Sequence, residues 1–307
     1  MTDLMGNSFS TAADAVFMER LIRSLQVSNF KISIITVVYH AADTIEQTFR
    51  SVVEQDYPNI EYIIIDGGST DGTLDVIKKY EDRIAYWVSE PDKGIYDAMN
   101  KGLSAATGDY IYYLGADDCL YDTAVISKIV SCLKSEAEPD VLCGAVMMVD
   151  PLYRIEKVYH SFFSEEAVLS GYNAPHQGMF VRRAILNQHP FDTNYRVAAD
   201  YKNFLIFYLD SNIILRQTDL IVAYYANDGV SGSEIEVQCM EYIRALQENG
   251  INTSAYYAKK KKENSSAIKS ILRWIFDKTG ILKQIRLRRG WEKHRCGWKG
   301  CRWCNFD

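Results

Sequence analysis

Hydrophobic residues between positions 30 and 120 recur with two alternating spacings. Four short runs are continuously apolar and rich in β-branched and aromatic residues, as strands buried on both faces of a sheet are. They span 32–39, 60–65, 84–88 and 110–114. Between these runs, the pattern predicts helices over about 42–55, 73–80 and 95–106. Because strands and helices alternate with short loops, we expect an α/β fold with a parallel sheet and right-handed crossovers.

The pattern is weaker in the rest of the chain. Residues 141–149 predict a further strand, which 153–159 would join as a hairpin. Helices are expected at 13–25 and 233–248. The first of these lies in an N-terminal helical extension, residues 1–29, in which we find no candidate chemistry.

The composition is that of a globular protein. The 307 residues, 48% of them hydrophobic, can bury a large core. No apolar run approaches the roughly 20 residues that span a bilayer, and the first residues lack the positive start and apolar stretch of a signal peptide. We therefore expect a cytoplasmic protein. Its seven cysteines, an odd number, suit reduced thiols better than a disulfide framework.

Charge is divided unequally along the chain. The net charge is -6, but residues 258–303 alone carry fifteen Lys and Arg against three acidic residues. Within this stretch, 268–276 has apolar residues at helical spacing, with Lys269 and Arg273 off the apolar face. A basic amphipathic helix with tryptophans nearby is typical of an anchor on anionic lipid. Packing on the acidic surface of the same protein is the alternative. The region lacks any nucleic-acid-binding module, so we expect no nucleic-acid partner.

The last stretch of the chain, residues 294–304, combines one histidine with three cysteines and two tryptophans. These are ligand types for zinc, but their spacing matches no standard zinc pattern. A disordered end and a membrane contact through the tryptophans are the other interpretations.

Two adjacent carboxylates, Asp117 and Asp118, follow the predicted strand at 110–114. On one tight turn they repel each other unless a cation lies between them or each has its own partner. Mg²⁺ or Mn²⁺, held by carboxylates together with substrate phosphates, meets that need. The alternative is a solvated acidic turn that caps the helix after Tyr121.

Further polar residues fall at or just past the ends of the predicted strands. Thr36, Asp66 and Lys93 occupy such positions, and a doubly wound sheet would gather them with Asp117 and Asp118 at one edge. That set, with the glycines after Asp66, suits a nucleotide diphosphate and its metal. The chain has neither the phosphate-binding loop of P-loop proteins nor the glycine spacing of a dinucleotide fold.

Together these residues resemble the glycosyltransferase family 2 enzymes, which have the GT-A fold. The resemblance covers about residues 32–231. Five signatures in the family's order carry it, at 33–39, 55–62, 66–72, 92–102 and 108–118. The segment from Lys93 to Asn100 is most similar to bacterial enzymes that build exopolysaccharide, capsule or O-antigen. The resemblance implies a GT-A domain over 30–232, with a mostly parallel central sheet and helices on both faces.

The resemblance also assigns roles in the donor half of that domain, residues 30–118. It implies that Asp66 holds the nucleotide base, usually uracil, and that Thr36, Lys93 and Asp117 contact the nucleotide. Asp118 would bind the metal on the diphosphate.

In the acceptor half, residues 119–232, the resemblance is looser. His176 could hold a diphosphate oxygen or an acceptor hydroxyl, beside Gln177, or it could simply satisfy backbone groups near Pro175. Asp200 aligns with the family's catalytic base, which takes the proton of the attacking hydroxyl in an inverting transfer. An N-cap role for Asp200 is compatible with this, and Asp192 is the second candidate for the base.

The sequence thus predicts a metal-dependent inverting glycosyltransferase with a helical, basic C-terminal region, 233–307, that associates with membrane. It would move a hexose or N-acetylhexosamine from a nucleotide sugar, UDP-linked, to a lipid-linked oligosaccharide at the inner face of the cytoplasmic membrane, using Mn²⁺ or Mg²⁺. A nucleotidyltransferase is a weaker alternative, because residues 38–42 lack its Gly-rich basic loop. A non-catalytic nucleotide-sugar-binding scaffold is the other.

Overall fold

A computed structural model describes residues 29–135, 137–169, 171–172, 174–226, 235–254, 256 and 281–294. The chain divides into two units, 1–30 and 31–307, and all the elements below belong to the second. The helices predicted at 13–25 and 268–276 lie outside the described residues, as does all of the 294–304 cluster except His294.

The donor half is a parallel sheet, as predicted. Its strands follow the order β3-β2-β1-β4 and are parallel throughout. They are β1 (Ile32–Val38), β2 (Ile60–Asp66), β3 (Tyr86–Ser89) and β4 (Tyr110–Tyr113). The connecting helices are α2 (Ile45–Val53), α3 (Thr73–Lys79), the short η1 (Glu81–Arg83) and α4 (Ile95–Ala105).

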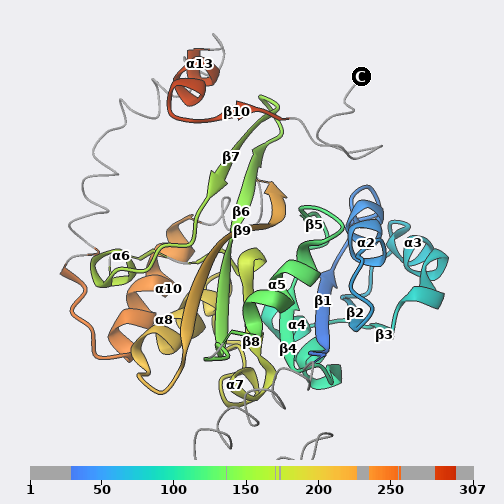
Figure 1. The fold of residues 1–307 in the computed structure, drawn as a ribbon, viewed down its shortest axis with the longest axis horizontal. Coiled ribbons are helices and arrows are strands. Elements are labelled where there is room, and N and C mark those ends of the chain that lie inside the picture. Colours follow the sequence, from blue (N-terminus) through green and yellow to red (C-terminus); the bar gives the residue numbers. More distant parts are fainter. Residues whose placement is uncertain are drawn as a thin grey trace, which may run out of the picture. The chain divides into compact units, whose positions relative to one another are not determined.

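Helices cover both faces of this sheet (Figure 1). Helix α4 packs on β1 and β2, where Met99 shares a core with Ile35 and Ile65. Helix α2 covers the other face, because its Phe49 meets the ring of Tyr62 edge-on at 5.5 Å. Neighbouring residues of a strand point to opposite faces, so both faces are apolar and the strands read as continuous hydrophobic runs.

Beyond β4 the sheet is mixed rather than parallel. Strand β8 (Met179–Arg182) runs antiparallel to β4, and β6 (Val141–Asp150) runs antiparallel to β8. The predicted hairpin is confirmed, because β7 (Ile155–Tyr159) pairs antiparallel with β6 across a short turn. A connection this short allows only antiparallel pairing. Strand β9 (Leu215–Ala226) pairs with β6 in parallel and with β5 (Cys119–Leu120) in antiparallel orientation.

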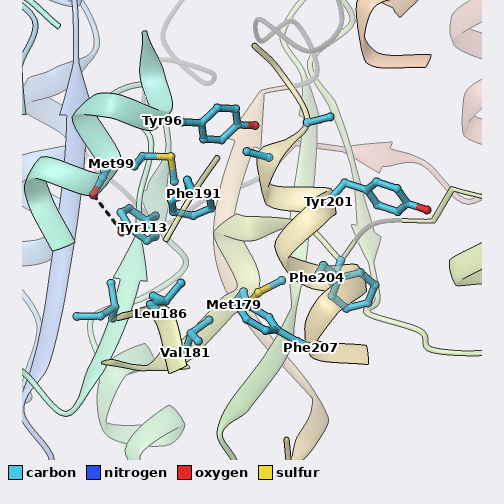
Figure 2. Close-up of a cluster of buried hydrophobic side chains, with 14 of the residues drawn as sticks. Tyr96, Met99, Tyr113, Met179, Val181, Leu186, Phe191, Tyr201, Phe204 and Phe207 are labelled. Carbon is cyan, nitrogen blue, oxygen red and sulfur yellow. Dashed lines mark hydrogen bonds between the residues drawn. The ribbon is translucent and has the colours of Figure 1, made fainter. Parts of the chain in front are cut away.

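The helices that follow in the chain are α5 (Val125–Leu133), α6 (Glu165–Leu169), η2 (His176–Gly178), α7 (Arg183–Gln188), α8 (Ala199–Leu209) and α10 (Ile235–Glu248). Of these, α6, α7, α8 and α10 contribute buried residues to the larger core. Figure 2 shows that aromatic side chains from α4, β4 and α8 gather there. Phe191 packs against Tyr96 and Tyr113, with ring centroids 5.4 Å away in each case. The core therefore joins the donor half to the acceptor half.

The described part of the basic tail packs on the β6–β7 hairpin. Strand β10 (Glu292–Lys293) pairs antiparallel with β7 (Figure 1). Arg286, from α13 (Ile281–Arg288), forms an ion pair with Asp150, and His294 pairs with Glu156. This short stretch follows the alternative of packing on the protein's own acidic surface.

Two expectations from composition can be compared with the described residues. Cys119, Cys132, Cys143 and Cys239 are all free thiols, as predicted. In the part of the chain that the structure describes, no helix has the length and apolar character needed to cross a membrane.

Candidate active site

A cavity of about 630 Å³ lies at the carboxyl ends of β1 and β4. Its walls come from the loops that follow these two strands and from the start of α4. Parallel α/β sheets bind ligands at this edge, and the volume is in the range of small-molecule sites. We call it the first cavity.

Asp66 supports the first cavity from beneath and does not line it. Its fully buried carboxylate accepts hydrogen bonds from the backbone N–H groups of Gly68 and Ser69, at 3.0 and 2.9 Å. It also accepts from the hydroxyls of Ser69 and Ser89, at 2.5 and 2.6 Å. Four donors fill the usual capacity of a carboxylate. In this structure Asp66 therefore organises the loop over residues 66–72, and the predicted contact with the base would require it to exchange a partner.

Thr36 and Lys93 also lie away from the first cavity. Thr36 is fully buried, and its hydroxyl is 3.3 Å from the hydroxyl of Tyr62 on the α2 face of the sheet. Its neighbours Ile35 and Val37 line the cavity instead, as alternation along a strand requires. Lys93 is exposed and lines a separate hollow with Arg196.

An aromatic pair that we did not single out in the sequence borders the first cavity. The ring of Tyr39, 63% exposed, stacks on His40 with centroids 4.0 Å apart. His40 has a positive φ of 49°, and its backbone N–H donates to the hydroxyl of Ser69 at 2.8 Å. A bulky residue in this region of backbone space is held there by its surroundings. The sequence signal that could have pointed to this pair was the presence of Tyr39 and His40 at the end of the first apolar run.

Asp117 and Asp118 curl back over the end of β4. A Cβ on Gly115 would lie 2.6 Å from a carboxylate oxygen of Asp118 and 3.0 Å from one of Asp117, so glycine is needed for both to approach. Asp117 is exposed and lines the first cavity, whereas Asp118 is buried. Neither caps a helix, because α5 begins at Val125 after Ala124. The capping alternative is therefore wrong.

The two carboxylates fit a divalent cation only as part of its ligand set. Among the described residues, no three or more His, Cys, Asp or Glu side chains are grouped to hold a metal. Mg²⁺ typically takes one or two carboxylates and completes its shell with water and substrate phosphates. Asp117 and Asp118, beside Gly115, can supply these one or two protein carboxylates.

A second cavity of about 390 Å³ adjoins the first. His176 lines both cavities, and Asp200 and Gln177 line the second. Sequence analysis predicted His176 and Gln177 on the acceptor or diphosphate side and Asp200 as the base, and the structure brings the three together. Tyrosine side chains form much of the remaining wall.

Asp200 is held at the junction by two partners. It lies in the first turn of α8 behind the N-cap Ala198, so it is not the cap itself. The hydroxyl of Tyr96 donates to Asp200 Oδ1 at 3.1 Å, and His176 Nδ1 is 3.8 Å from Oδ2. Burial raises the pKa of Asp200. His176, Tyr96 and a backbone N–H lower it by more than burial raises it, so the pKa of Asp200 lies below the usual value of an aspartate. Asp200 is therefore ionised at neutral pH.

His176 is affected in the opposite direction. Burial lowers its pKa, but the charges of Asp200, Asp118 and Asp117 raise it more, and the net pKa is above the usual 6.5. The proton on this ring is thus stabilised by carboxylates from both cavities.

Asp192, the second candidate for the base, has a structural role. Its carboxylate accepts from Asn194 and forms an ion pair with Lys202 at 2.8 Å. Burial raises its pKa, but these hydrogen bonds lower it to about 2. It lines neither of the two cavities.

The fold and the site define a class. A sheet that is parallel at one end, with a carboxylate-bearing cavity at its edge and a buried carboxylate beside it, is the arrangement of an α/β transferase for nucleotide-linked substrates. The chain belongs to glycosyl transferase family 2, whose family model matches residues 33–200.

Relatives and solved structures agree with this assignment. A PGL/p-HBAD biosynthesis glycosyltransferase of Mycobacterium bovis is 28% identical over 218 residues, which are 70% of this chain and 83% of that protein. S. aureus TarS 1–349 in complex with UDP is similar with a TM-score of 0.55 and 18% identity, over 80% of this chain and 78% of that one. The mannosyltransferase PcManGT from Pyrobaculum calidifontis, in complex with GDP-Man and Mn²⁺, is similar with a TM-score of 0.54 and 16% identity, over 89% of each chain. These structural similarities confirm the predicted GT-A fold.

The interaction of His176 with Asp200 can be tested by NMR. Because the Asp200 carboxylate favours the protonated ring, Asp200→Asn should lower the pKa of His176. Titration of the imidazole ring protons of His176 measures this directly. Asp192→Asn is the control, since that carboxylate binds Lys202, and it should leave the pKa of His176 unchanged. Equal values in the wild type and Asp200→Asn would show that the two groups do not interact.

Proposed function

We propose that this glycosyltransferase moves a hexose or N-acetylhexosamine from a nucleotide sugar, UDP-linked, to a lipid-linked glycan, with inversion at the anomeric carbon. One observation carries the proposal: the two cavities share His176, with Asp117 on one side and Asp200 on the other. A donor in the first cavity and an acceptor in the second would meet beside an ionised carboxylate.

The first cavity suits the nucleotide. The exposed ring of Tyr39 offers a surface on which a base can stack. Asp92 also lines the cavity, and one of its oxygens accepts from the Gly94 N–H at 2.8 Å. Its remaining acceptor capacity is available to a base N–H or a ribose hydroxyl. That the TarS structure contains UDP and PcManGT contains GDP-Man supports a nucleotide-sugar donor without choosing its base.

Asp118 and Asp117 would hold a divalent cation, Mn²⁺ or Mg²⁺, together with the donor's diphosphate. Such an ion would neutralise charge on the departing diphosphate. The chain's own contribution is to place two carboxylates over Gly115 and to fix their loop. The hydroxyl of Thr48 fixes this loop, because its one hydrogen is shared between the backbone carbonyl oxygens of Asp118 and Ala116, at 2.6 and 3.0 Å.

Asp200 would act as the general base. Tyr96 donates to Oδ1 and His176 faces Oδ2. Each carboxylate oxygen has two lone pairs, so Asp200 could accept the proton of an acceptor hydroxyl while it keeps these partners. As that hydroxyl oxygen bonds to the anomeric carbon, the bond to the nucleoside diphosphate breaks and the diphosphate leaves with the electron pair. Because its pKa is low, Asp200 stays ionised across the physiological pH range and can therefore accept a proton.

Asp200→Asn should therefore lower the transfer rate by about 10²–10⁴-fold, the usual contribution of a general base. Donor affinity should be kept, because Asp200 does not line the first cavity. Rate measurements with a radiolabelled nucleotide sugar, paired with nucleotide-binding titrations, separate these effects. Asp192→Asn should retain nearly full activity. Full transfer activity in Asp200→Asn would show that Asp200 is not the base. Cellular function that survives Asp200→Asn, with no transfer activity in either protein, would favour the non-catalytic scaffold.

Metal-dependent donor binding can be measured by thermal shift with UDP, GDP and dTDP sugars, with and without Mn²⁺. One nucleotide series should raise the melting temperature by several degrees in the presence of Mn²⁺, as binding to the folded state requires. Asp118→Ala should abolish this shift. Asp122→Asn, a nearby acidic residue that pairs with Lys128, should not. An unchanged shift in Asp118→Ala would remove Asp118 from the metal site.

We also propose that the C-terminal region binds the anionic inner face of the cytoplasmic membrane, where a lipid-linked acceptor would lie. The four lysines at 259–262 are outside the described residues, and their charge supports this proposal. Replacing all four with Glu should strongly reduce co-sedimentation with phosphatidylglycerol vesicles. Phosphatidylcholine vesicles are the control, because electrostatic binding should be absent there. Equal binding of both proteins to anionic vesicles would refute the anchor.

A further inference from the structure

The second cavity has a wall chemistry that restricts its ligand. Tyr159, Tyr172, Tyr225 and Tyr242 line it, coming from β7, the 171–172 turn, β9 and α10. Gln177 and Gln238 add amide groups. The surface that this lining exposes is more polar than apolar, and uncharged hydroxyl and amide groups can bind the hydroxyls of a small molecule. The cavity volume of about 390 Å³ is sufficient for such a ligand.

The tyrosine rings are fixed in place by the fold. The rings of Tyr159 and Tyr172 are nearly parallel, with an interplanar angle of 10° and centroids 6.1 Å apart. The hydroxyl of Tyr172 accepts from the Phe162 N–H at 2.9 Å and donates to the His160 carbonyl at 3.2 Å. Tyr242 stacks on Tyr201 at 4.0 Å. The wall is therefore a prearranged aromatic surface, against which binding orders few side chains.

The charge of the cavity excludes anions. Among the described residues that line it, Asp200 is an ionised acid and His176 is the only base, with no lysine or arginine. That histidine already faces Asp200 at 3.8 Å and lies near Asp117 and Asp118. Burial raises the pKa values of Tyr159, Tyr172 and Tyr225, so their hydroxyls are neutral. A phosphate or carboxylate here would lose hydration, would be repelled by Asp200 and would have to share with Asp200 the one base among these residues, His176.

We infer that the second cavity binds an uncharged sugar ring of the acceptor, without phosphate or carboxylate groups. The ring's C–H face would lie on the tyrosine wall, and its hydroxyls would reach Gln177, Gln238 and Asp200. This inference rests on the proposed function, in which Asp200 receives the proton of an acceptor hydroxyl. It deepens that function by naming the chemical class of the acceptor unit.

The full-length protein, saturated with UDP and Mn²⁺, can be tested by saturation-transfer NMR. The probes are methyl glycosides of glucose, galactose, mannose and N-acetylglucosamine, beside methyl glucuronide and glucose 6-phosphate. At least one neutral glycoside should bind, with saturation on its ring C–H protons, and the charged probes should bind at least tenfold more weakly. Charged probes that bind as well as the neutral ones, or a complete lack of sugar binding, would overturn the inference.

Two matched pairs of variants link binding to the cavity. Tyr159→Ala should abolish the saturation transfer, whereas Tyr159→Phe keeps the ring and should retain it. Gln238→Lys should reduce the preference for neutral over phosphorylated probes at least tenfold, and Gln238→Met should not. The lysine variant gains affinity for an anion, so misfolding cannot imitate its expected result. If charge at residue 238 has no effect on the preference, this cavity is not the acceptor site.

The nucleotide measurement keeps the two proposals apart. A nucleotide that stabilises the protein while no neutral glycoside binds would overturn the acceptor inference and leave the transferase proposal in place. The absence of any nucleotide binding would overturn the transferase proposal, whatever the sugar probes show.

Discussion

The buried carboxylate of Asp66 is the constraint on which the donor side of the site depends. A charge removed from water must be fully hydrogen-bonded, and here its partners come from the loop after β2 and from the last residue of β3. The hydroxyl of Ser69 connects Asp66 to the loop after β1, since it donates to Asp66 and accepts from the backbone N–H of His40. The loop after β1, with the exposed ring of Tyr39, is thus positioned by a buried charge that does not line the cavity.

The acceptor side depends on a second charge cluster, in which His176 lies between carboxylates of both cavities. Its imidazole faces Asp200 on one side and is close enough to Asp117 and Asp118 to respond to their charge. Under the proposed function, a change in charge in the first cavity, such as the arrival of a cation, would therefore alter the proton affinity of a group that also lines the second.

Much of the fold could be predicted from the sequence, because three strands of the donor half, β1, β2 and β4, are buried on both faces and have little polar interruption. Strand β9 was missed, since it begins with the polar residues 216–219, which mask its pattern. For the site, the structure brings Asp117, His176, Gln177 and Asp200 to the walls of the two cavities, and their roles stay predictions. Sequence position could not distinguish a carboxylate that lines a cavity, as Asp117 does, from one such as Asp66 that supports it, because both follow a strand. Thr36 lies between Ile35 and Val37, which line the first cavity. Because neighbouring residues of a strand point to opposite faces, Thr36 points away from that cavity.

The pairing of β4 with β8 has a consequence for how the enzyme can move. Through that seam a single hydrogen-bonded sheet runs from β3 to β10, and Phe191 packs across it against Tyr96 and Tyr113. In the described part of the chain the two halves share a sheet and a core, so we do not expect them to move against each other as separate rigid bodies. Catalytic geometry would then be set when the chain folds and not by the closure of two domains.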